Sequence, residues 1–327
     1  MRAIEITRPG GPEVLAFCER PMPEVGPGEV LIRVAAAAVN RPDVQQRRGL
    51  YPPPPGTTDL PGLDVAGIVE AASPDVSWPK PGDAVCALAN GGGYAEYCAV
   101  PAGQCMPLPK GSDFVQAAAL PEAYFTAWNN VMWLGRLAEG ETLLVQGGTS
   151  GVGMAAIQMA KQLRSARVVA TAGTGEKLDK CRAIGADHAV SYRGDWPAAV
   201  VEAIGAQQVD VVLDGQAGPY TEQQLQLLAP DGRVVLIASH LGEMAEVNVR
   251  NIVRRRLTLT GSTLRPRTAA YKARLAAELV REVWPLLETG RIENHICAVF
   301  DWRDVRDAHA LMDAGEQVGK VVLTVRA

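Results

Sequence analysis

The sequence predicts an α/β protein in which a barrel-like β region is followed by a doubly wound parallel sheet. Residues 1–120 contain many short apolar runs separated by turns with Gly and Pro, a pattern typical of small β-barrels. Residues 121–263 alternate runs of Val, Leu and Ile with helical segments, and such uninterrupted apolar runs fit parallel strands buried on both faces. Residues 264–327 add a long helix, a short strand, a second helix and a final strand.

Turns organise the first region. The Pro-Gly pairs in GPGE (26–29) and KPGD (80–83) suit tight turns, and the strands that we expect are RAIEI, EVLIRVAAAAV, DVAGIVEAA, DAVCAL and YAEYCAV. The prolines at 52–55 favour an extended polyproline stretch without internal hydrogen bonds. Because this stretch interrupts a compact β region, a rigid loop beside a cleft explains it better than a linker does.

A helical pattern over 112–137, for which Ser112 is the expected N-cap, leads from the first region into the second. Strands and helices then alternate, and the expected strands are TLLVQGG, RVVATAG, HAVSY, VDVVLDG, RVVLIAS and RLTLTGS. Together they predict a parallel sheet of about six strands with helices on both faces.

Composition limits the classes of function. The chain has 327 residues, 47% of them hydrophobic and 21% charged, which indicates a globular protein of two domains. A net charge of −4 argues against a nucleic-acid partner, and no run is apolar and long enough to predict a membrane partner. MRAIEIT alternates like a strand and lacks the apolar stretch of a signal peptide, so we expect a cytoplasmic protein. Six Cys without a CxxC pair and four His without an HxxxH spacing predict no metal site.

A glycine-rich loop lies between the strand TLLVQGG and the helix that follows it. The loop reads Gly148-Thr149-Ser150-Gly151-Val152-Gly153, which is G-x-S-x-x-G, with Ser where the common dinucleotide fingerprint has its middle Gly. Backbone N–H groups at the start of the helix are expected to hold a pyrophosphate, and the serine to add a hydroxyl donor. The loop therefore predicts a Rossmann domain that binds a dinucleotide.

The end of the second strand of this domain bears on the choice of dinucleotide. RVVAT runs into Ala172-Gly173-Thr174-Gly175, without the carboxylate that usually bonds the 2′-OH of NAD. Lys177 follows and could pair with a 2′-phosphate, and Tyr192 could lie over the same pocket. Spacing alone favours Lys177 as a solvated helix residue, so the choice of NADPH over NADH draws on the resemblance described next.

The chain resembles the zinc-free quinone oxidoreductases of the medium-chain dehydrogenase/reductase superfamily over nearly its full length, and within them the p53-inducible quinone oxidoreductase type. The resemblance rests on several segments in order, namely GGPEVL, GPGEVLIRVAAAAVNRPDVQQRRGLYPPPPG, PGLDVAGIVE, LPEAYFTAWNNV, GGTSGVG, GSTLRPR and AHALMDAGEQVGKVVL. It implies that a GroES-like β-barrel catalytic domain (1–120, completed by 264–327) contains an inserted Rossmann domain (121–263) that binds NADPH. It also implies a nicotinamide in a cleft and a homodimer through the Rossmann edge strand at 255–263.

The resemblance assigns candidate site residues one by one. Asn40 and Tyr51 match positions that line the quinone pocket, and Asp64 stands where relatives more often carry Glu. The positions that match cofactor contacts are Thr126 at the nicotinamide carboxamide, Gly148, Thr149, Ser150, Gly151, Val152 and Gly153 at the pyrophosphate, Lys177 and Tyr192 at the 2′-phosphate, and Lys320 near the phosphate end. Four of the residues also have plain structural explanations: Asn40 as a turn cap, Tyr51 as a brace for the proline loop, Asp64 as an acceptor for backbone in its turn and Thr126 as an ordinary helix residue.

These residues imply hydride transfer from NADPH to a small-molecule quinone without a metal. Zinc alcohol dehydrogenases of the superfamily need a Cys near position 40 and a GHE segment, where this chain has NRPD and GLD. A quinone is already a good hydride acceptor, so Asn40 and Tyr51 need only donate hydrogen bonds to its oxygen, with Tyr51 as an orienting donor and solvent as the proton source. Reduction of a 2-alkenal or enone, with a larger part for Tyr51, and a non-catalytic NADPH-binding sensor remain as alternatives.

Overall fold

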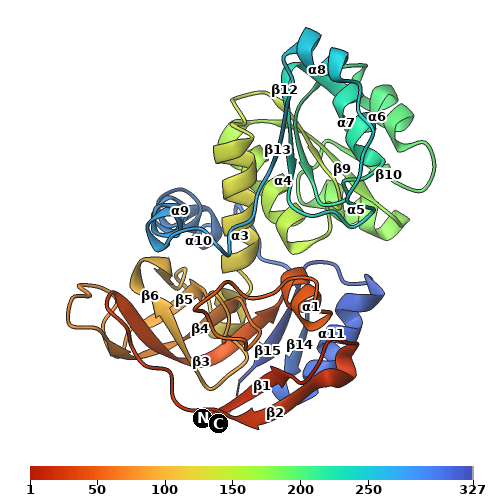
Figure 1. Cartoon of the computed structure of the whole chain (residues 1–327). Coiled ribbons are helices and arrows are strands. Elements are labelled where there is room, and N and C mark those ends of the chain that lie inside the picture. The colour runs from red at the N-terminus through yellow and green to blue at the C-terminus, as the bar shows by residue number, and fades with distance from the viewer. Residues whose placement is uncertain (326–327) are drawn as a thin grey trace. The chain divides into compact units, whose positions relative to one another are not determined.

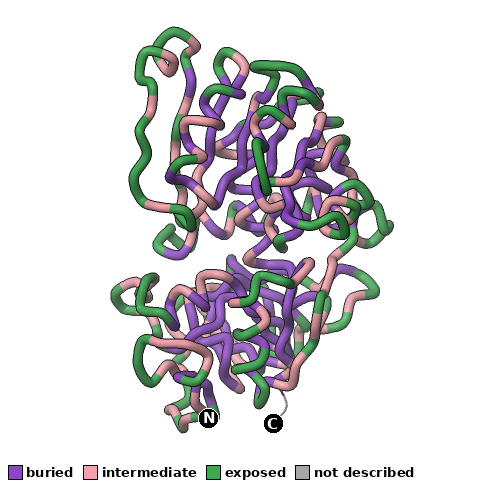
Figure 2. The backbone as a smooth tube through the Cα atoms, turned by 90° about the vertical axis from the view of Figure 1, so that its right-hand side faces the viewer, coloured by how far each residue is buried: buried purple, intermediate pink, exposed green. Residues whose placement is uncertain are grey.

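The computed structural model describes residues 1–325 and divides into two compact units (Figure 1). Unit 1 comprises Met1–Phe125 and the chain from Leu264 on, and unit 2 comprises Thr126–Thr263. Each unit has its own buried interior (Figure 2). The division expected from the sequence lies about one helical turn earlier, at 120–121. Helix α3 (Pro121–Ala127) starts within unit 1 because the backbone N–H of Glu122 donates to Asp64 Oδ1 at 2.6 Å.

Unit 1 contains the strands expected in the first region. A two-stranded sheet pairs β1 (Arg2–Ile6) with β2 (Leu15–Glu19), and a seven-stranded sheet has the order β14-β15-β3-β4-β5-β7, with β6 paired to β3. The strands of the larger sheet are β3 (Glu29–Val39), β4 (Asp64–Ala72), β5 (Ala84–Leu88), β6 (Tyr97–Pro101), β7 (Cys105–Pro107), β14 (Ile296–Asp301) and β15 (Lys320–Thr324). The last strand, β15, pairs antiparallel with β3, so the C-terminal segment completes the first domain.

The helices of unit 1 cover the sheet and its ends. They are α1 (Arg41–Arg47), α2 (Phe114–Ala118), the start of α3, α9 (Ala269–Glu282), α10 (Trp284–Glu288) and α11 (Val305–Ala314), with short 3-10 turns at Pro12–Val14, Ala102–Gln104 and Trp302–Asp304.

The single helix expected from Ser112 onward is instead three helical segments. Asp113, not Ser112, is the N-cap of α2, because its side chain accepts the backbone N–H of Gln116 at 2.8 Å. Pro121 has no N–H to continue a helix, and α3 begins at that residue. A π-helix over Trp128–Leu134 follows α3.

Unit 2 is the doubly wound domain. Its parallel sheet has the order β10-β9-β8-β11-β12-β13, formed by β8 (Thr142–Val145), β9 (Arg167–Ala172), β10 (His188–Ser191), β11 (Val209–Asp214), β12 (Leu228–Leu236) and β13 (Thr258–Gly261). The connecting helices lie on both sides of it (Figure 1) and are α4 (Gly151–Arg164), α5 (Gly175–Ala183), α6 (Trp196–Ile204), α7 (Tyr220–Leu227) and α8 (Val249–Arg255). The strand order reverses beside β8, which is the position where such sheets bind dinucleotides.

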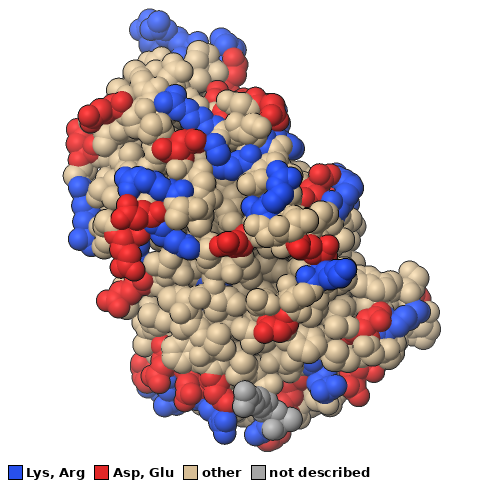
Figure 3. Space-filling view, turned by 180° about the vertical axis from the view of Figure 1, so that it is seen from behind, with Lys and Arg blue, Asp and Glu red and all other residues tan. Residues whose placement is uncertain are grey.

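The surface carries charges of both signs. Figure 3 shows Lys and Arg interspersed with Asp and Glu on the face that it presents. Within residues 1–325, none of the helices has the length and apolar character that a membrane span requires.

A buried polar network joins α1 to α11 inside unit 1. The guanidinium of Arg47 is fully buried and donates to Asp313 Oδ2 at 2.7 Å and to Gly10 O at 3.0 Å. Its Nη1 lies 3.2 Å from His309 Nδ1, and His309 Nε2 lies 3.1 Å from the Tyr94 hydroxyl. Since a guanidinium only donates, Nδ1 of His309 accepts and the ring proton is on Nε2, which donates to Tyr94.

Burial keeps this histidine neutral. Loss of solvation lowers the pKa of His309 to about 3, and the positive charge of Arg47 acts in the same direction. Below about pH 6.5, His309 is therefore protonated in the unfolded chain but stays neutral in the folded chain. Stability contributed by neutral His309 is therefore complete above pH 6.5 and is lost as the pH falls toward 3.

His309→Gln removes this titration but keeps an acceptor for Arg47 and a donor for Tyr94. Between pH 7 and pH 5, urea unfolding of the wild type should lose about 2 kcal/mol more free energy than that of His309→Gln, by proton linkage. Burial raises the pKa of Asp43 to about 6, so its titration changes the free energy of unfolding with pH in the opposite direction. Because Asp43 is present in both proteins, its effect cancels in the comparison. Parallel pH dependences for the two proteins would contradict the account of His309.

Candidate active site

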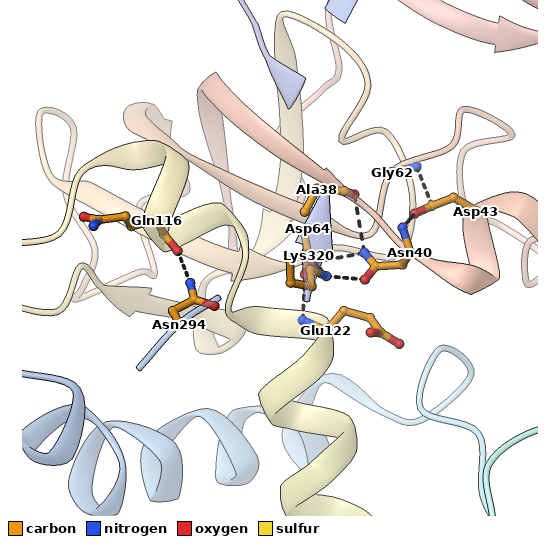
Figure 4. A network of polar contacts seen from close by, with 9 residues as sticks. All are labelled: Ala38, Asn40, Asp43, Gly62, Asp64, Gln116, Glu122, Asn294 and Lys320. Carbon is orange, nitrogen blue, oxygen red and sulfur yellow. Dashed lines mark hydrogen bonds and ion pairs between the residues drawn. The ribbon is translucent and has the colours of Figure 1, made fainter. Parts of the chain in front are cut away.

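Three neighbouring strands bring the main polar group of unit 1 to one end of the sheet. Lys320 begins β15, Asp64 begins β4, and Asn40 directly follows β3. The antiparallel registers pair Val39 with Val321 and Ala38 with Asp64, so the three side chains meet although they are far apart in the chain (Figure 4). The sheet topology thus places the cluster, which we name the Asn40–Asp64–Lys320 cluster.

The cluster is a closed set of hydrogen bonds (Figure 4). Lys320 Nζ donates to Asp64 Oδ2 at 2.8 Å and also to Asn40 Oδ1. Asn40 Nδ2 donates to the same Asp64 Oδ2 at 2.9 Å, and a longer contact of 3.4 Å directs it toward Ala38 O. Because an ammonium only donates and a carboxylate only accepts, one orientation of the Asn40 carboxamide satisfies both neighbours.

Asp64 is held as a buried counter-ion. Its side chain has 0% exposure, against 6% for that of Lys320, and its other oxygen accepts the backbone N–H of Glu122. A buried carboxylate is tolerated only when it is paired and hydrogen-bonded, and here three donors surround it. Asp64 therefore does bond backbone, but it also carries the charge that holds Lys320.

A second buried carboxylate, Asp43, fixes the backbone around the cluster. Its Oδ2 accepts the Asn40 backbone N–H at 2.8 Å and its Oδ1 accepts the Gly62 backbone N–H at 3.0 Å (Figure 4). Burial raises the pKa of Asp43 to about 6, which these two hydrogen bonds oppose. Sequence reasoning did not single out Asp43, although Asn followed by Asp at the third helical position of α1 is the spacing of a capping box.

One prediction for this unit needs correction, and a second stays a prediction. Asn40 was expected to offer N–H to a substrate oxygen, but its amide is committed to Asp64 and directed to Ala38, so it is both a helix cap and a bridge. Lys320 was expected near the phosphate end of a cofactor; its ammonium binds Asn40 and Asp64, and the expected cofactor contact stays a prediction. Residue spacing alone did not show that β15 lies beside β3, which brings Lys320 to Asn40 and Asp64.

Tyr51 belongs to a different set of contacts. The guanidinium of Arg265 lies 5.6 Å from the centre of the Tyr51 ring, a cation–π arrangement. Arg265 is itself held by Nε to Asn90 O at 2.9 Å and Nη1 to Gln46 Oε1 at 2.8 Å. Burial lowers the pKa of Arg265. The ring of Tyr51 is thus anchored where the proline loop begins.

The donor set of the cluster does not fit a zinc ion. Asn40 and Asp64 stand where the zinc-dependent pattern has Cys and the last residue of GHE, and both already bind an ammonium, which would repel a second cation. Throughout residues 1–325, no group of three or more His, Cys, Asp or Glu side chains is arranged to hold a metal.

In unit 2 the glycine-rich loop joins β8 to α4. Ser150 is the N-cap of α4: its Oγ accepts the Gly153 N–H at 3.0 Å and donates to Gly147 O at 2.9 Å. The hydroxyl expected as a donor to the pyrophosphate therefore stabilises the loop itself. The N–H of Gly148 donates to Thr171 O at 2.9 Å, which ties the loop to β9.

Close packing explains the two outer glycines. A Cβ on Gly153 would lie 2.4 Å from Gly147 O, and a Cβ on Gly148 would lie 2.7 Å from the Cys181 sulfur. Across the described residues, the N–H groups of Thr149, Gly151 and Val152 have no protein acceptor. These three donors at the start of a helix fit a pyrophosphate.

The tip of β9 is neutral in the structure as in the sequence. Ala172 and Gly173 end the strand, and the Thr174 side chain caps α5 by accepting the Lys177 N–H at 3.3 Å. The Tyr192 N–H donates to Ala172 O at 3.1 Å, and its phenol lies so close to Gly173 that a Cβ there would be 2.3 Å from the hydroxyl oxygen. The phenol of Tyr192 thus lies against this tip, and Lys177 stands in the first turn of the helix that follows it.

Thr126 begins unit 2 near the end of α3. Its carbonyl oxygen accepts Nδ2 of Asn130 at 2.7 Å, across the junction of α3 and the π-helix. That contact is made by the backbone, so the expected contact of the Thr126 side chain with a nicotinamide stays a prediction.

Comparisons with known proteins agree with both halves of this description. Residues 26–110 match the alcohol dehydrogenase GroES-like domain and residues 151–281 match the zinc-binding dehydrogenase family. The quinone oxidoreductase of Lama guanicoe is 33% identical, with 100% of this chain and 98% of that protein covered.

Solved structures are similarly close. An NAD-dependent alcohol dehydrogenase superimposes with a TM-score of 0.86 at 33% identity, with 100% of both chains covered. A mycobacterial protein complexed with NADPH has a TM-score of 0.86 at 31% identity, over 99% of this chain and 100% of that one. The fold and the glycine-rich loop are those of an enzyme that binds a nicotinamide cofactor. The chain therefore belongs to the quinone oxidoreductase family of the medium-chain dehydrogenase/reductase superfamily.

Proposed function

We propose that the protein is a zinc-independent NADPH:quinone oxidoreductase. The observation that carries the proposal is the Asn40–Asp64–Lys320 cluster, in which the residues at two metal-ligand positions of zinc-dependent relatives, Asn40 and Asp64, both bind an ammonium. Zinc serves to polarise an alcohol or a simple carbonyl. A quinone has two conjugated carbonyls and gains aromaticity on reduction, so it suits a site without that Lewis acid.

The residues of unit 2 would hold the cofactor. The N–H groups of Thr149, Gly151 and Val152 and the dipole of α4 favour the pyrophosphate, and Gly153 lets the helix start close to the loop. When bound, NADPH supplies a hydride. Lys177 and Tyr192, at the neutral tip of β9, suit a 2′-phosphate better than the 2′-OH of NADH, which usually needs a carboxylate there.

A rate comparison tests this function. The loss of the reduced-nicotinamide absorbance should be fast with NADPH and an ortho- or para-quinone, and slow with an enone. NADH should give a kcat/KM at least about tenfold lower, because it lacks the charge-assisted contacts of the 2′-phosphate. Faster turnover of the enone would assign the protein to alkene reduction, and NADPH binding without turnover of any acceptor would assign it to the sensor class.

A variant of α5 separates the 2′-phosphate contact from general effects. Lys177→Ala should raise the KM for NADPH about tenfold and leave the KM for NADH unchanged. Lys180→Ala, one helical turn along α5, is the matched control and should change neither. Equal effects of Lys177→Ala on the two cofactors would refute the role of Lys177.

We also propose a homodimer through β13. This strand ends the Rossmann sheet, and Leu259 on it is 39% exposed, which leaves an apolar edge to be covered. Light scattering should give twice the 34.7 kDa of one chain, and Leu259→Lys should give the mass of one chain. Val299→Lys, on the edge strand β14 of unit 1, is the control and should keep the dimer. A wild type with the mass of one chain would rule the dimer out.

A further inference from the structure

The ammonium group of Lys320 has one more donor than its protein partners use. It carries three N–H donors, of which one goes to Asp64 Oδ2 and one to Asn40 Oδ1. Within residues 1–325 no third acceptor lies within hydrogen-bond distance of it. Of the ion pair, only Lys320 retains exposure, 6% of its side chain against 0% for Asp64. The remaining donor therefore belongs to the one member of the pair whose side chain keeps any solvent exposure.

The other polar groups of the cluster are already committed. Asn40 gives one amide hydrogen to Asp64 and directs the amide toward Ala38. Asp64 is an acceptor surrounded by three donors, which include the Glu122 N–H. A substrate oxygen that approaches the cluster thus meets Lys320 as its donor.

We propose that Lys320 is a catalytic residue whose third N–H donates to the substrate oxygen on which negative charge develops. The ammonium then does the electrostatic work that a zinc ion does in zinc-dependent relatives, with Asp64 and Asn40 as its fixed supports. This inference rests on the proposed quinone reduction, and it adds a direct contact between Lys320 and the substrate that the proposed function did not include.

The reaction balances with Lys320 unchanged. A quinone that takes up a hydride gains two electrons and one proton, and one of its oxygens becomes a phenolate. The hydride is the one that NADPH loses in becoming NADP⁺. One proton from solvent converts the phenolate to the hydroquinone, so the ammonium stabilises the phenolate by a charge-assisted hydrogen bond and keeps its own protons.

Binding of a phenolate tests the assignment without turnover. The probe is 4-nitrophenol, titrated into protein saturated with NADP⁺, and 4-nitroanisole is the isostere that cannot carry the charge. The wild type should bind 4-nitrophenolate about 10- to 100-fold more tightly than 4-nitroanisole, the range for a hydrogen bond to a charged group. The phenolate absorbance band should also show that binding lowers the pKa of the probe. Equal affinities, no binding of the phenolate, or an unchanged or raised probe pKa would overturn the assignment.

Two variants locate the effect at Lys320. Lys320→Met alone would leave Asp64 buried without a counter-ion, so the informative protein is Lys320→Met/Asp64→Asn, which removes both charges. It should bind NADP⁺ and lose the preference for 4-nitrophenolate, whereas Lys320→Arg keeps a cation paired with Asp64 and should keep the preference. A double variant that retains the preference would overturn the proposal. If the double variant does not fold, the wild-type titration with its two probes decides.

Quinone turnover is measured separately, so the two proposals fail in different ways. In the double variant kcat with a quinone should fall at least about tenfold while the KM for NADPH stays the same, because the lost interaction belongs to the transition state. A wild type that prefers the phenolate through Lys320 but reduces no quinone would refute the proposed function and keep the oxyanion site. An unchanged kcat in the double variant would refute the catalytic role of Lys320.

Discussion

The carboxylate of Asp64, which has no exposure to solvent, is the constraint on which the rest of the site depends. A charge in that position is tolerated only with donors on every side, and the donors come from three distant parts of the chain. Lys320 comes from the last strand, Asn40 from the turn after β3, and the Glu122 N–H from the start of α3. Satisfying one carboxylate therefore requires the C-terminal segment to return to the first domain.

Further buried polar side chains of unit 1 are also held by hydrogen bonds to distant parts of the chain. Asp43 holds the backbone of Asn40 and Gly62, while Arg47 and His309 join α1 to α11 in the interior of unit 1. The loop of unit 2 is built differently. Its close packing requires glycine at positions 148 and 153, and it leaves backbone N–H groups without a protein acceptor among residues 1–325. The cluster of unit 1 is thus built from paired charges, and the loop of unit 2 from glycine packing and a helix N-terminus.

The sequence was most informative where function depends on local geometry. The strand runs, the loop from Gly148 to Gly153 and the neutral tip at Gly173 could all be identified from neighbouring residues. Local pattern did not reveal the protein partners of Lys320, which lie 280 and 256 positions away in the chain and depend on the pairing of β15 with β3. Asp43 and His309 were not singled out, because their roles depend on burial and residue spacing does not reveal which polar side chains are buried. The hydroxyl of Ser150 was misjudged because capping competes with ligand binding for the same group.

A double-mutant cycle on Asp64 and Lys320, read out as the free energy of unfolding in urea, tests the central claim most directly. If each charge serves as the counter-ion of the other, Lys320→Met alone should lower the free energy of unfolding by about 3–5 kcal/mol. Adding Asp64→Asn should then restore a large part of that loss. The coupling energy should then exceed about 2 kcal/mol. Additive losses, with the double variant as unstable as the sum of the single ones, would contradict the account.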